Sequence, residues 1–354
     1  MNYKDDFNVF VGGQSGVFKG IKVKEKSCLT KNIQNLVSIT DHHQVTFMTW
    51  SDNDEKEILL ACGSKDTRSV KTFDTEYHSF KTSFVCDIGK GPITGIAKCN
   101  NHILTAVQSG QIKLWTHNDN LGEQLLLEAG EGLCRMRQAR KEKTVIATGG
   151  LENPLKLFNL EKKANTFTAK NVRHDWLEMR VPVSISDLCF MSDDRQVLTV
   201  GKYGHIRLYD TNAQRRPVLD VEMKDEAVTS VTSCFHDFQV VCGTGKGKMN
   251  LVDLRKTGKI LNSYKGPVGA VTALAVSKSE PYVVSVSYDR HLYVHDLSTK
   301  KLLKKVYLTS KLSGMVLRSE FSMKEVEKEE DNEIEMCEVK SDSESEDSDI
   351  EFSD

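Results

Sequence analysis

Short segments rich in Val, Ile, Leu, Tyr and Phe recur along the chain, and most of them come in pairs joined by a turn with glycine or aspartate. Such pairs are typical of β-hairpins. No segment of any length shows the period of a helix, so the pattern predicts an all-β fold. The recurring pairs read ILLACGSKDTRSVKTFDT, HILTAVQSGQIKLWTHN, TVIATGGLENPLKLFNL, QVLTVGKYGHIRLYDT, QVVCGTGKGKMNLVDL and YVVSVSYDRHLYVHDL.

The ends of these pairs recur at a regular spacing. The residues that follow the aromatic position, or its substitute, are 42, 43, 51, 43 and 43 residues apart. A repeat of about 43 residues with an aromatic-Asp ending is typical of WD-repeat propellers, in which each unit forms a four-stranded blade. The marker positions are Asp74, Thr116, Asn159, Asp210, Asp253 and Asp296.

A further hairpin, FNVFVGGQSGVFKGIKV, precedes the first of these units and makes seven blades in all. Its innermost strand is missing, and LSGMVL at 312–317, just after the outer-strand candidate KKVYL at 304–308, is a plausible donor. Pairing of 312–317 with the first blade would close the ring and leave no long sheet edge exposed. The sequence therefore predicts a seven-bladed WD-repeat β-propeller over residues 7–321.

The repeats are degenerate. A complete WD unit has an aspartate in its middle hairpin turn, and here only Asp66 and Asp289 occupy that position. The Gly-His positions before the inner strand read Gly91-Pro92 and Gly266-Pro267 instead. Most blades must therefore rely on packing of apolar side chains, each large buried one contributing about 1.5 to 3 kcal/mol.

The single long interval, 51 residues, contains the segment AKNVRHDWLEMRVP at 169–182. Its tryptophan and arginines resemble the anchors that dominate protein interfaces. The alternative is a loop whose Trp176 packs against its own blade while its charges are solvated. The candidate partner-binding residues in this insertion are Lys170, Asn171, Arg173, Asp175, Trp176 and Arg180.

A second candidate, QRRP at 214–217, follows strand-end Asp210 and is expected in the turn that leaves the same blade. The proline fixes the turn, so Arg215 and Arg216 should point outward. The alternative is an ordinary solvated turn.

Several functional classes lack support. The nine cysteines include no CxxC pair, which argues against a zinc module or a disulfide framework. GTGKGK at 243–248 lacks the Ser or Thr and the helix of a phosphate-binding loop, so it is expected to be a hairpin turn. No secretory signal, membrane span, metal motif or catalytic constellation is found. We expect a soluble intracellular protein that is not an enzyme and has no cofactor, metal or small-molecule substrate.

Charge is divided unevenly along the chain. Residues 324–354 carry 15 acidic residues and three lysines, whereas the remainder has ten more basic than acidic residues. The basic body points to a nucleic-acid or ribonucleoprotein partner. The acidic tail, residues 322–354, is predicted to be disordered. Ser341, Ser343 and Ser348 each precede a glutamate by three residues, which suits an acidophilic kinase; the alternative is a solubilising tail that shields the basic body.

Four segments together resemble a known family. AKNVRHDWLEMRVP, QRRPVL, TGGLENPLKLFNL and KVYLTSKLSGMVL are similar to the WD repeat-containing protein 74 family, called Nsa-one in yeast, and the similarity extends over residues 7 to about 320. The resemblance implies a non-enzymatic assembly factor of the large (60S) ribosomal subunit. It also implies a location in the nucleus, within the nucleolus. Such a factor docks on pre-60S particles through assembly factors and pre-rRNA, is needed for rRNA processing and is released by an AAA-type ATPase.

The resemblance also implies a monomer within a larger complex, without membrane attachment, whose partner-binding segments map onto the insertion residues named above together with Arg215 and Arg216. One departure concerns the end of the chain, because relatives tend to end in a basic tail that looks like a nucleolar targeting signal and this chain ends acidic. A rival reading rests on Val252-Asp253-Leu254-Arg255, which resembles the WDxR ending of substrate receptors of cullin-type ubiquitin ligases.

Overall fold

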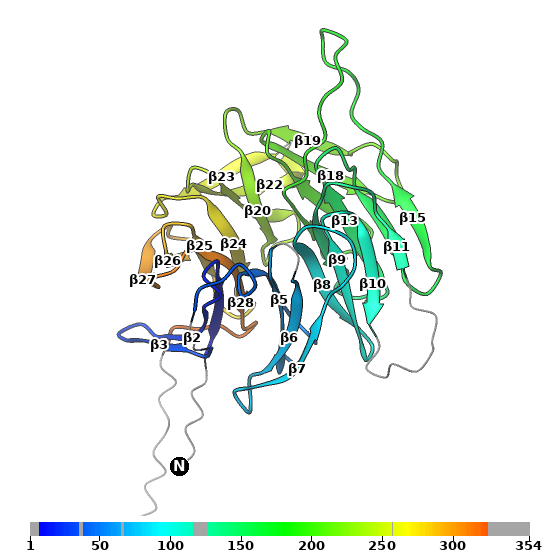
Figure 1. Cartoon of the computed structure of the whole chain (residues 1–354). Coiled ribbons are helices and arrows are strands. Elements are labelled where there is room, and N and C mark those ends of the chain that lie inside the picture. Colours follow the sequence, from blue (N-terminus) through cyan, green and yellow to red (C-terminus); the bar gives the residue numbers. More distant parts are fainter. Residues whose placement is uncertain (1–6, 35–37, 65–66, 116–125, 257, 325–354) are drawn as a thin grey trace, which may run out of the picture. The chain divides into compact units, whose positions relative to one another are not determined.

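The computed structural model describes residues 7–34, 38–64, 67–115, 126–256 and 258–324. Within these ranges the chain forms seven four-stranded antiparallel sheets and one short 3-10 turn (Figure 1). The innermost strands of all seven sheets line one central cavity, so the sheets are the blades of a propeller. The predicted all-β, seven-bladed architecture is therefore confirmed.

The first four blades follow one another along the chain, and the first of them takes its inner strand from the C-terminal end. From the inner to the outer strand they are β28 (Leu312–Leu317), β1 (Val9–Gly13), β2 (Phe18–Val23) and β3 (Cys28–Asn32); β4 (Val45–Trp50), β5 (Glu57–Cys62), β6 (Ser69–Asp74) and β7 (Ser79–Val85); β8 (Ile93–Cys99), β9 (His102–Val107), β10 (Gln111–Trp115) and β11 (Leu126–Glu128); β12 (Leu133–Gln138), β13 (Val145–Gly150), β14 (Lys156–Asn159) and β15 (Ala164–Thr168).

The remaining three blades each consist of four consecutive strands. A 3-10 turn, η1 (Leu254–Lys256), follows the third strand of the middle one. From the inner to the outer strand they are β16 (Asp187–Phe190), β17 (Gln196–Val200), β18 (His205–Asp210) and β19 (Leu219–Glu222); β20 (Val228–Ser233), β21 (Gln239–Thr244), β22 (Met249–Asp253) and β23 (Lys259–Tyr264); β24 (Val271–Val276), β25 (Tyr282–Ser287), β26 (His291–Asp296) and β27 (Leu302–Tyr307).

The ring is completed by strands from both ends of the described chain. β28 pairs antiparallel with β1, with Val9 opposite Leu317 and Val11 opposite Met315. The indole N–H of Trp50 in β4 donates to the carbonyl oxygen of Leu317 at 2.9 Å, which ties this blade to the next. Beyond residue 321, where the propeller was expected to end, Met323 is also buried.

The core lies between neighbouring blades, because each sheet packs its apolar faces against those of its neighbours. One cluster joins Ile21 of β2 with Val286 of β25 and Leu292 of β26, and so links the first blade to the last. Another contains Phe10, Phe18 and Phe73, with the Phe18 and Phe73 ring centroids 5.1 Å apart. Both sides of the middle strands are covered, which explains their nearly continuous apolar sequences.

One turn keeps the aspartate-centred hydrogen bonds of a WD unit, although its blade has Gly266-Pro267 in place of Gly-His. Asp289, between β25 and β26, accepts from the backbone N–H groups of Val268 and His291, both at 3.0 Å, and from the Tyr293 hydroxyl at 2.6 Å. Burial acts to raise the pKa of Asp289, but these hydrogen bonds outweigh it and hold the pKa below its usual value. The other predicted turn aspartate, Asp66, lies outside the described residues.

Several smaller predictions can be compared with the structure. GTGKGK is a hairpin turn between β21 and β22, as predicted, and Gly247 has a φ of +86°. Every cysteine in the described ranges is free, and five of those eight are buried. The described ranges contain no helix with the length and apolarity that a bilayer crossing demands. Thr116, the acidic tail from residue 325 onward, and Ser341, Ser343 and Ser348 lie outside the described residues.

Candidate partner-binding site

The predicted insertion forms the connection between outer strand β15 of one blade and inner strand β16 of the next. In Figure 1 it is the long green loop that extends beyond the strands at the top of the view. Its base begins at Ala169, which is buried, whereas residues 173–180 are all exposed. The insertion is therefore a projection from the seam between two blades.

Hydrogen bonds made within the insertion define the shape of its tip. The Asp175 carboxylate accepts from the backbone N–H groups of Leu177 and Met179 at 2.9 and 2.8 Å. The backbone of Asp175 also exchanges hydrogen bonds with Met179 and Glu178, both at 3.0 Å. Glu178 has a φ of +61°, which closes the turn. Asp175, predicted to contact a partner, thus has a structural role in holding the tip.

Trp176 lies at this tip and is 88% exposed, the highest value among the exposed large apolar side chains of the described residues. Leu177 and Met179 beside it are 51% and 56% exposed. The alternative reading, in which Trp176 packs against its own blade, is therefore wrong. An apolar group of this size held in water is typical of a contact site.

The arms of the insertion are fixed to each other and to the neighbouring hairpin. The Asn171 amide donates to the carbonyl oxygen of Val181 at 2.7 Å and so joins the two arms. Glu152 exchanges backbone and side-chain bonds with Val183 and accepts from the Arg180 guanidinium at 2.7 Å. Glu152 was missed in the sequence, because it lies in the β13–β14 turn and only the fold brings it to the insertion.

The second candidate segment meets the insertion in space. The turn with Arg215 and Arg216 lies between β18 and β19, within the blade, so the expectation that it leaves the blade is wrong. Arg215 donates its Nε–H to the Thr168 carbonyl and accepts the Lys170 N–H through its own carbonyl, both at 2.8 Å. Arg216 donates to the carbonyl of Asn171 at 3.3 Å.

Both arginines are exposed, as predicted. The arrangement brings together two segments that lie about 45 residues apart in the sequence. These two segments together present a set of exposed side chains that we call the insertion surface. It consists of Lys170, Arg173, Trp176, Arg180, Arg215 and Arg216.

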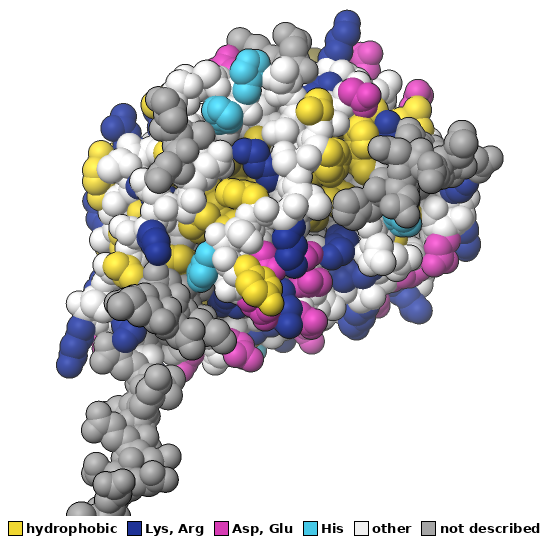
Figure 2. Space-filling model, turned by 60° about the horizontal axis from the view of Figure 1, so that its bottom comes forward, with side chains coloured by type: hydrophobic (Ala, Val, Ile, Leu, Met, Phe, Trp, Pro, Cys, Tyr) yellow, Lys and Arg dark blue, Asp and Glu magenta, His cyan; other side chains and the backbone are white. Residues whose placement is uncertain are grey.

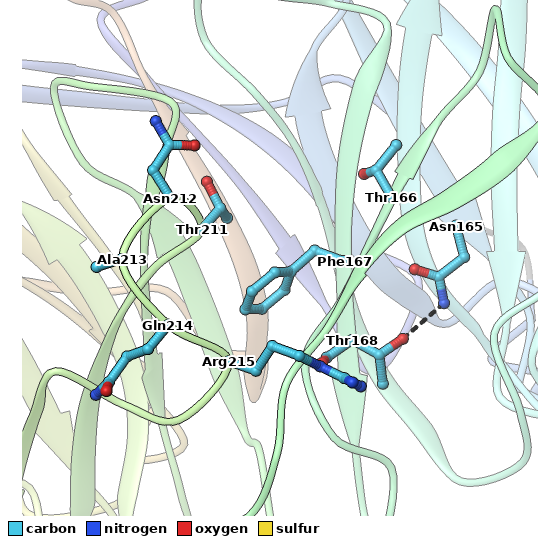
Figure 3. A pocket seen from close by; sticks show the side chains of 9 residues that line it. All are labelled: Asn165, Thr166, Phe167, Thr168, Thr211, Asn212, Ala213, Gln214 and Arg215. Atoms are coloured by element: carbon cyan, nitrogen blue, oxygen red, sulfur yellow. Dashed lines mark hydrogen bonds between the residues drawn. The ribbon is translucent and has the colours of Figure 1, made fainter.

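A pocket of about 610 Å³ adjoins this surface between β15 and the β18–β19 turn (Figure 3). The Phe167 ring points into it, and Arg215 lies at one side. The rest of the lining is mainly Thr, Asn and Gln, without His, Cys, Asp or Glu. The pocket therefore offers hydrogen-bonding groups and one aromatic ring, but no strong acid, base or thiol nucleophile.

The central channel holds a charged group that sequence reasoning missed. Asp187 of β16 is buried and lies 3.2 Å from Arg135 Nε and 3.0 Å from Arg137 Nη2, both in β12. It also accepts from the backbone N–H of Val231 in β20 at 3.2 Å. Both guanidinium groups lie over the Phe47 ring of β4, at 5.3 and 5.5 Å from its centroid.

Burial lowers the pKa of Arg135, and the Asp187 charge opposes this shift. Four blades thus meet at one ion-paired cluster, which serves packing of the ring. Two arginines at alternate positions of an inner strand that also contains Leu, Cys and Met, LCRMRQ, were the available signal.

The segment behind the ubiquitin-ligase reading has a local contact. Arg255 is ion-paired with buried Asp253, with Nη2 and Oδ2 3.1 Å apart, and it also bonds through its Nε–H and backbone N–H. Arg255, in the turn η1, is therefore engaged by the last residue of the preceding strand β22.

Comparisons with known proteins show which family the chain belongs to. The family "WD domain, G-beta repeat" matches residues 258–296. WD repeat-containing protein 74 of Bos taurus is 34% identical over 316 residues, which is 88% of this chain and 80% of the bovine protein. The chain belongs to the WD repeat-containing protein 74 family. The Homo sapiens member of that family has the same identity and coverage.

A more distant relative carries a different name. The ribosome biogenesis protein NSA1 of Meyerozyma guilliermondii is 28% identical over 306 residues, covering 74% of this chain and 76% of the yeast protein. The family resemblance read from the insertion and its neighbouring segments is thus confirmed for the WD repeat-containing protein 74 family.

Proposed function

We propose that the protein is a non-enzymatic ribosome biogenesis factor that docks on nucleolar precursors of the large (60S) ribosomal subunit through the insertion surface. The observation that carries this proposal is Trp176, 88% exposed at the tip of a loop whose shape is fixed by Asp175. A large apolar side chain exposed to water is unfavourable, and a binding partner that covers it removes this cost. The process, ribosome biogenesis, is taken from the name of the NSA1 relatives.

Two kinds of contact follow from the residues of the insertion surface. Trp176, with Leu177 and Met179, suits the apolar pocket of a protein assembly factor. Lys170, Arg173, Arg215 and Arg216 suit the phosphates of pre-rRNA at its edge. Each neutralised phosphate would add roughly 0.7 to 0.9 to the log-log dependence of RNA affinity on salt.

The remaining surface supports a ribonucleoprotein environment in a weaker way. Lys and Arg side chains are spread over the face seen in Figure 2, among acidic and apolar ones. Such a distribution favours general attraction to an anionic particle over one dedicated binding patch. We place the protein in the nucleus and nucleolus, as a monomer within the particle, with a role in rRNA processing and release by an AAA-type ATPase. Phosphorylation of Ser341, Ser343 and Ser348 belongs to the same proposal.

The test is a double variant, Trp176→Ala with Arg180→Ala, expressed in place of the wild-type protein. We expect it to fold and to leave the pre-60S fractions of a sucrose gradient, because both side chains are exposed and neither supports the core. The matched control, Tyr77→Ala with Lys90→Ala, changes an exposed aromatic residue and an exposed cation elsewhere and should remain with the particles. A folded insertion variant that still co-sediments would show that docking occurs elsewhere.

Affinity purification of the wild-type chain tests the class of function. We expect components of large-subunit precursors to co-purify with it. Mass spectrometry of the same sample detects whether Ser341, Ser343 and Ser348 are phosphorylated. Recovery of a cullin-ligase adaptor without ribosomal proteins would contradict the proposal.

A further inference from the structure

A second cavity, of about 620 Å³, occupies the centre of the propeller at the ends of the inner strands. All seven inner strands contribute to its wall. The wall combines polar and charged groups with apolar side chains, of which Leu274, Val276 and Trp50 are only half-buried there. Half-exposed apolar side chains in a concave site are the usual lining of a binding pocket.

Basic residues outnumber acidic ones in the lining of this cavity, in which Asp52 and Glu55 are the acidic members. Arg140 and Lys143 lie in the β12–β13 turn and Lys278 in the β24–β25 turn, and all three line the cavity. Burial lowers the pKa of Lys143; Asp194 opposes this, while the positive charges of Arg140 and Lys278 add to it. The positive charges of Arg140 and Lys278 thus both act on Lys143, although Lys278 comes from a separate blade.

The acidic groups nearby are engaged by the chain itself. Asp194 accepts from three backbone N–H groups of the β12–β13 turn at 2.8 to 3.3 Å. Glu55 accepts the backbone N–H of Ser319 at 2.9 and 3.0 Å. Asp52 accepts the N–H of Lys56 at 3.4 Å. Within the described ranges no ion pair joins Arg140, Lys143 or Lys278 to an acidic side chain, so their N–H groups can still bind a ligand. Asp194 and Asp52 nevertheless act to raise the pKa of Lys143 and offset part of the positive charge.

We infer that this channel mouth binds a short acidic peptide segment of a partner protein, with one bulky apolar side chain seated in the cavity. The apolar side chain would cover Leu274 and Val276, and the flanking carboxylates would meet Lys143, Lys278 and Arg140. A nucleic acid fits less well, because its bases stack on aromatic faces and two of the three half-exposed apolar side chains, Leu274 and Val276, are aliphatic.

This site is distinct from the insertion surface. The insertion leads into the start of β16 at Asp187, whereas the cavity is lined by Cys189 and Phe190 at the end of that strand. The two sites therefore lie at opposite ends of β16, and the inference does not rest on the function proposed for Trp176.

The test measures binding of a synthetic peptide to the full chain. The probe has phenylalanine at its centre and aspartate or glutamate at every other position. Trp50 lines the cavity, so a change in tryptophan fluorescence accompanies binding at the mouth. We expect a double reversal, Lys143→Glu with Lys278→Glu, to weaken the affinity roughly tenfold or more. If the charge-reversal variant fails to fold, the neutral variant Lys143→Gln with Lys278→Gln replaces it in the same binding measurement.

The matched control reverses the same amount of charge far from the channel, at Lys162 and Lys301, which are exposed near outer strands β15 and β27. This control and Trp176→Ala should bind the probe as the wild type does, and a probe with serine in place of phenylalanine should bind more weakly. An equal loss of probe affinity in the Lys143 and Lys278 variant and in the control variant would overturn the inference. The absence of any binding to the wild type would also overturn it. Tighter binding of a single-stranded RNA of equal charge, lost with the same lysines, would also overturn it.

Discussion

Two aspartate-centred turns in this molecule differ in what their hydrogen bonds connect. Asp289 binds the N–H of Val268, which precedes its blade's inner strand, and the hydroxyl of fully buried Tyr293 in β26. Asp175 makes similar bonds, but every one of them stays within five consecutive residues of the insertion. The same side chain thus stabilises a blade in one place and shapes an exposed tip in the other.

The difference shows how a repeat protein separates stability from recognition. Contacts that join distant parts of the sequence are lost only when the fold is lost, so they contribute to global stability. Contacts within a short loop can break and reform while the blades stay intact. A change in the shape of the insertion therefore need not destabilise the propeller.

The largest expected effect comes from removing the strand that joins the two ends of the chain. A chain that stops at Lys311 lacks β28, and we expect it to aggregate or to show no cooperative thermal transition. Its six missing buried side chains, at about 1.5 to 3 kcal/mol each, together match or exceed a typical total stability of roughly 5 to 15 kcal/mol. They are Leu312, Met315, Val316, Leu317, Phe321 and Met323.

A chain that stops at Lys324 retains all these residues and is the control for this truncation. Circular dichroism melting and size-exclusion chromatography compare the two. A chain ending at Lys311 that melts like the control would show that β28 is dispensable for closure.

Next in size is Asp289→Ala. The variant leaves the N–H groups of Val268 and His291 and the Tyr293 hydroxyl without their acceptor, so we expect a loss of roughly 2 to 4 kcal/mol in the free energy of unfolding. Urea denaturation measures the loss. Tyr293→Phe removes one of the three bonds and should cost less. A loss for Asp289→Ala below that of Tyr293→Phe would contradict the role given to this turn.

The same aspartate should make stability depend on pH. Its pKa is lowered in the folded state, so the stabilisation is present above the unfolded-state pKa of about 3.9 and is lost as the pH falls through the folded-state value. We expect the difference in unfolding free energy between wild type and Asp289→Asn to shrink between pH 5 and pH 2. A difference that stays constant across this range would rule out the charge as its source.

The smallest effect on global stability is expected for Asp175→Ala. Its bonds are local and its surroundings are exposed, so the free energy of unfolding should change by no more than roughly 0.5 kcal/mol. Amide hydrogen exchange at Leu177 and Met179 should nevertheless become faster. Unchanged exchange at these two amides would show that the tip keeps its shape without the carboxylate.

The architecture could be predicted from sequence because a propeller repeats one local pattern. The strand ends at Asp210, Asp253 and Asp296 fixed the period, and the unpaired hairpin at 7–23 implied a donor strand elsewhere. Neither inference required knowledge of distant contacts.

The candidate sites depend on contacts between distant residues, and these were harder to predict. Arg215 meets Thr168 because the β18–β19 turn of one blade lies beside the end of β15 in the neighbouring blade, and Glu152 reaches Arg180 because the β13–β14 turn lies beside the insertion. The exposure of Trp176 depends on a turn closed by Glu178 at positive φ, which no pattern of charges and apolar residues indicated. Lys143 and Lys278 were overlooked because two different blades bring them to one mouth.

The pairing of β28 with β1 also sets the order in which the molecule can be completed during translation. Strand β1 is synthesised early, yet its inner neighbour Leu312–Leu317 is made only after every other described strand. Throughout that interval the nascent chain carries an unpaired, apolar strand edge, which is the kind of surface that chaperones cover. The blade that contains the earliest of the described strands is thus the last of the described blades to be completed.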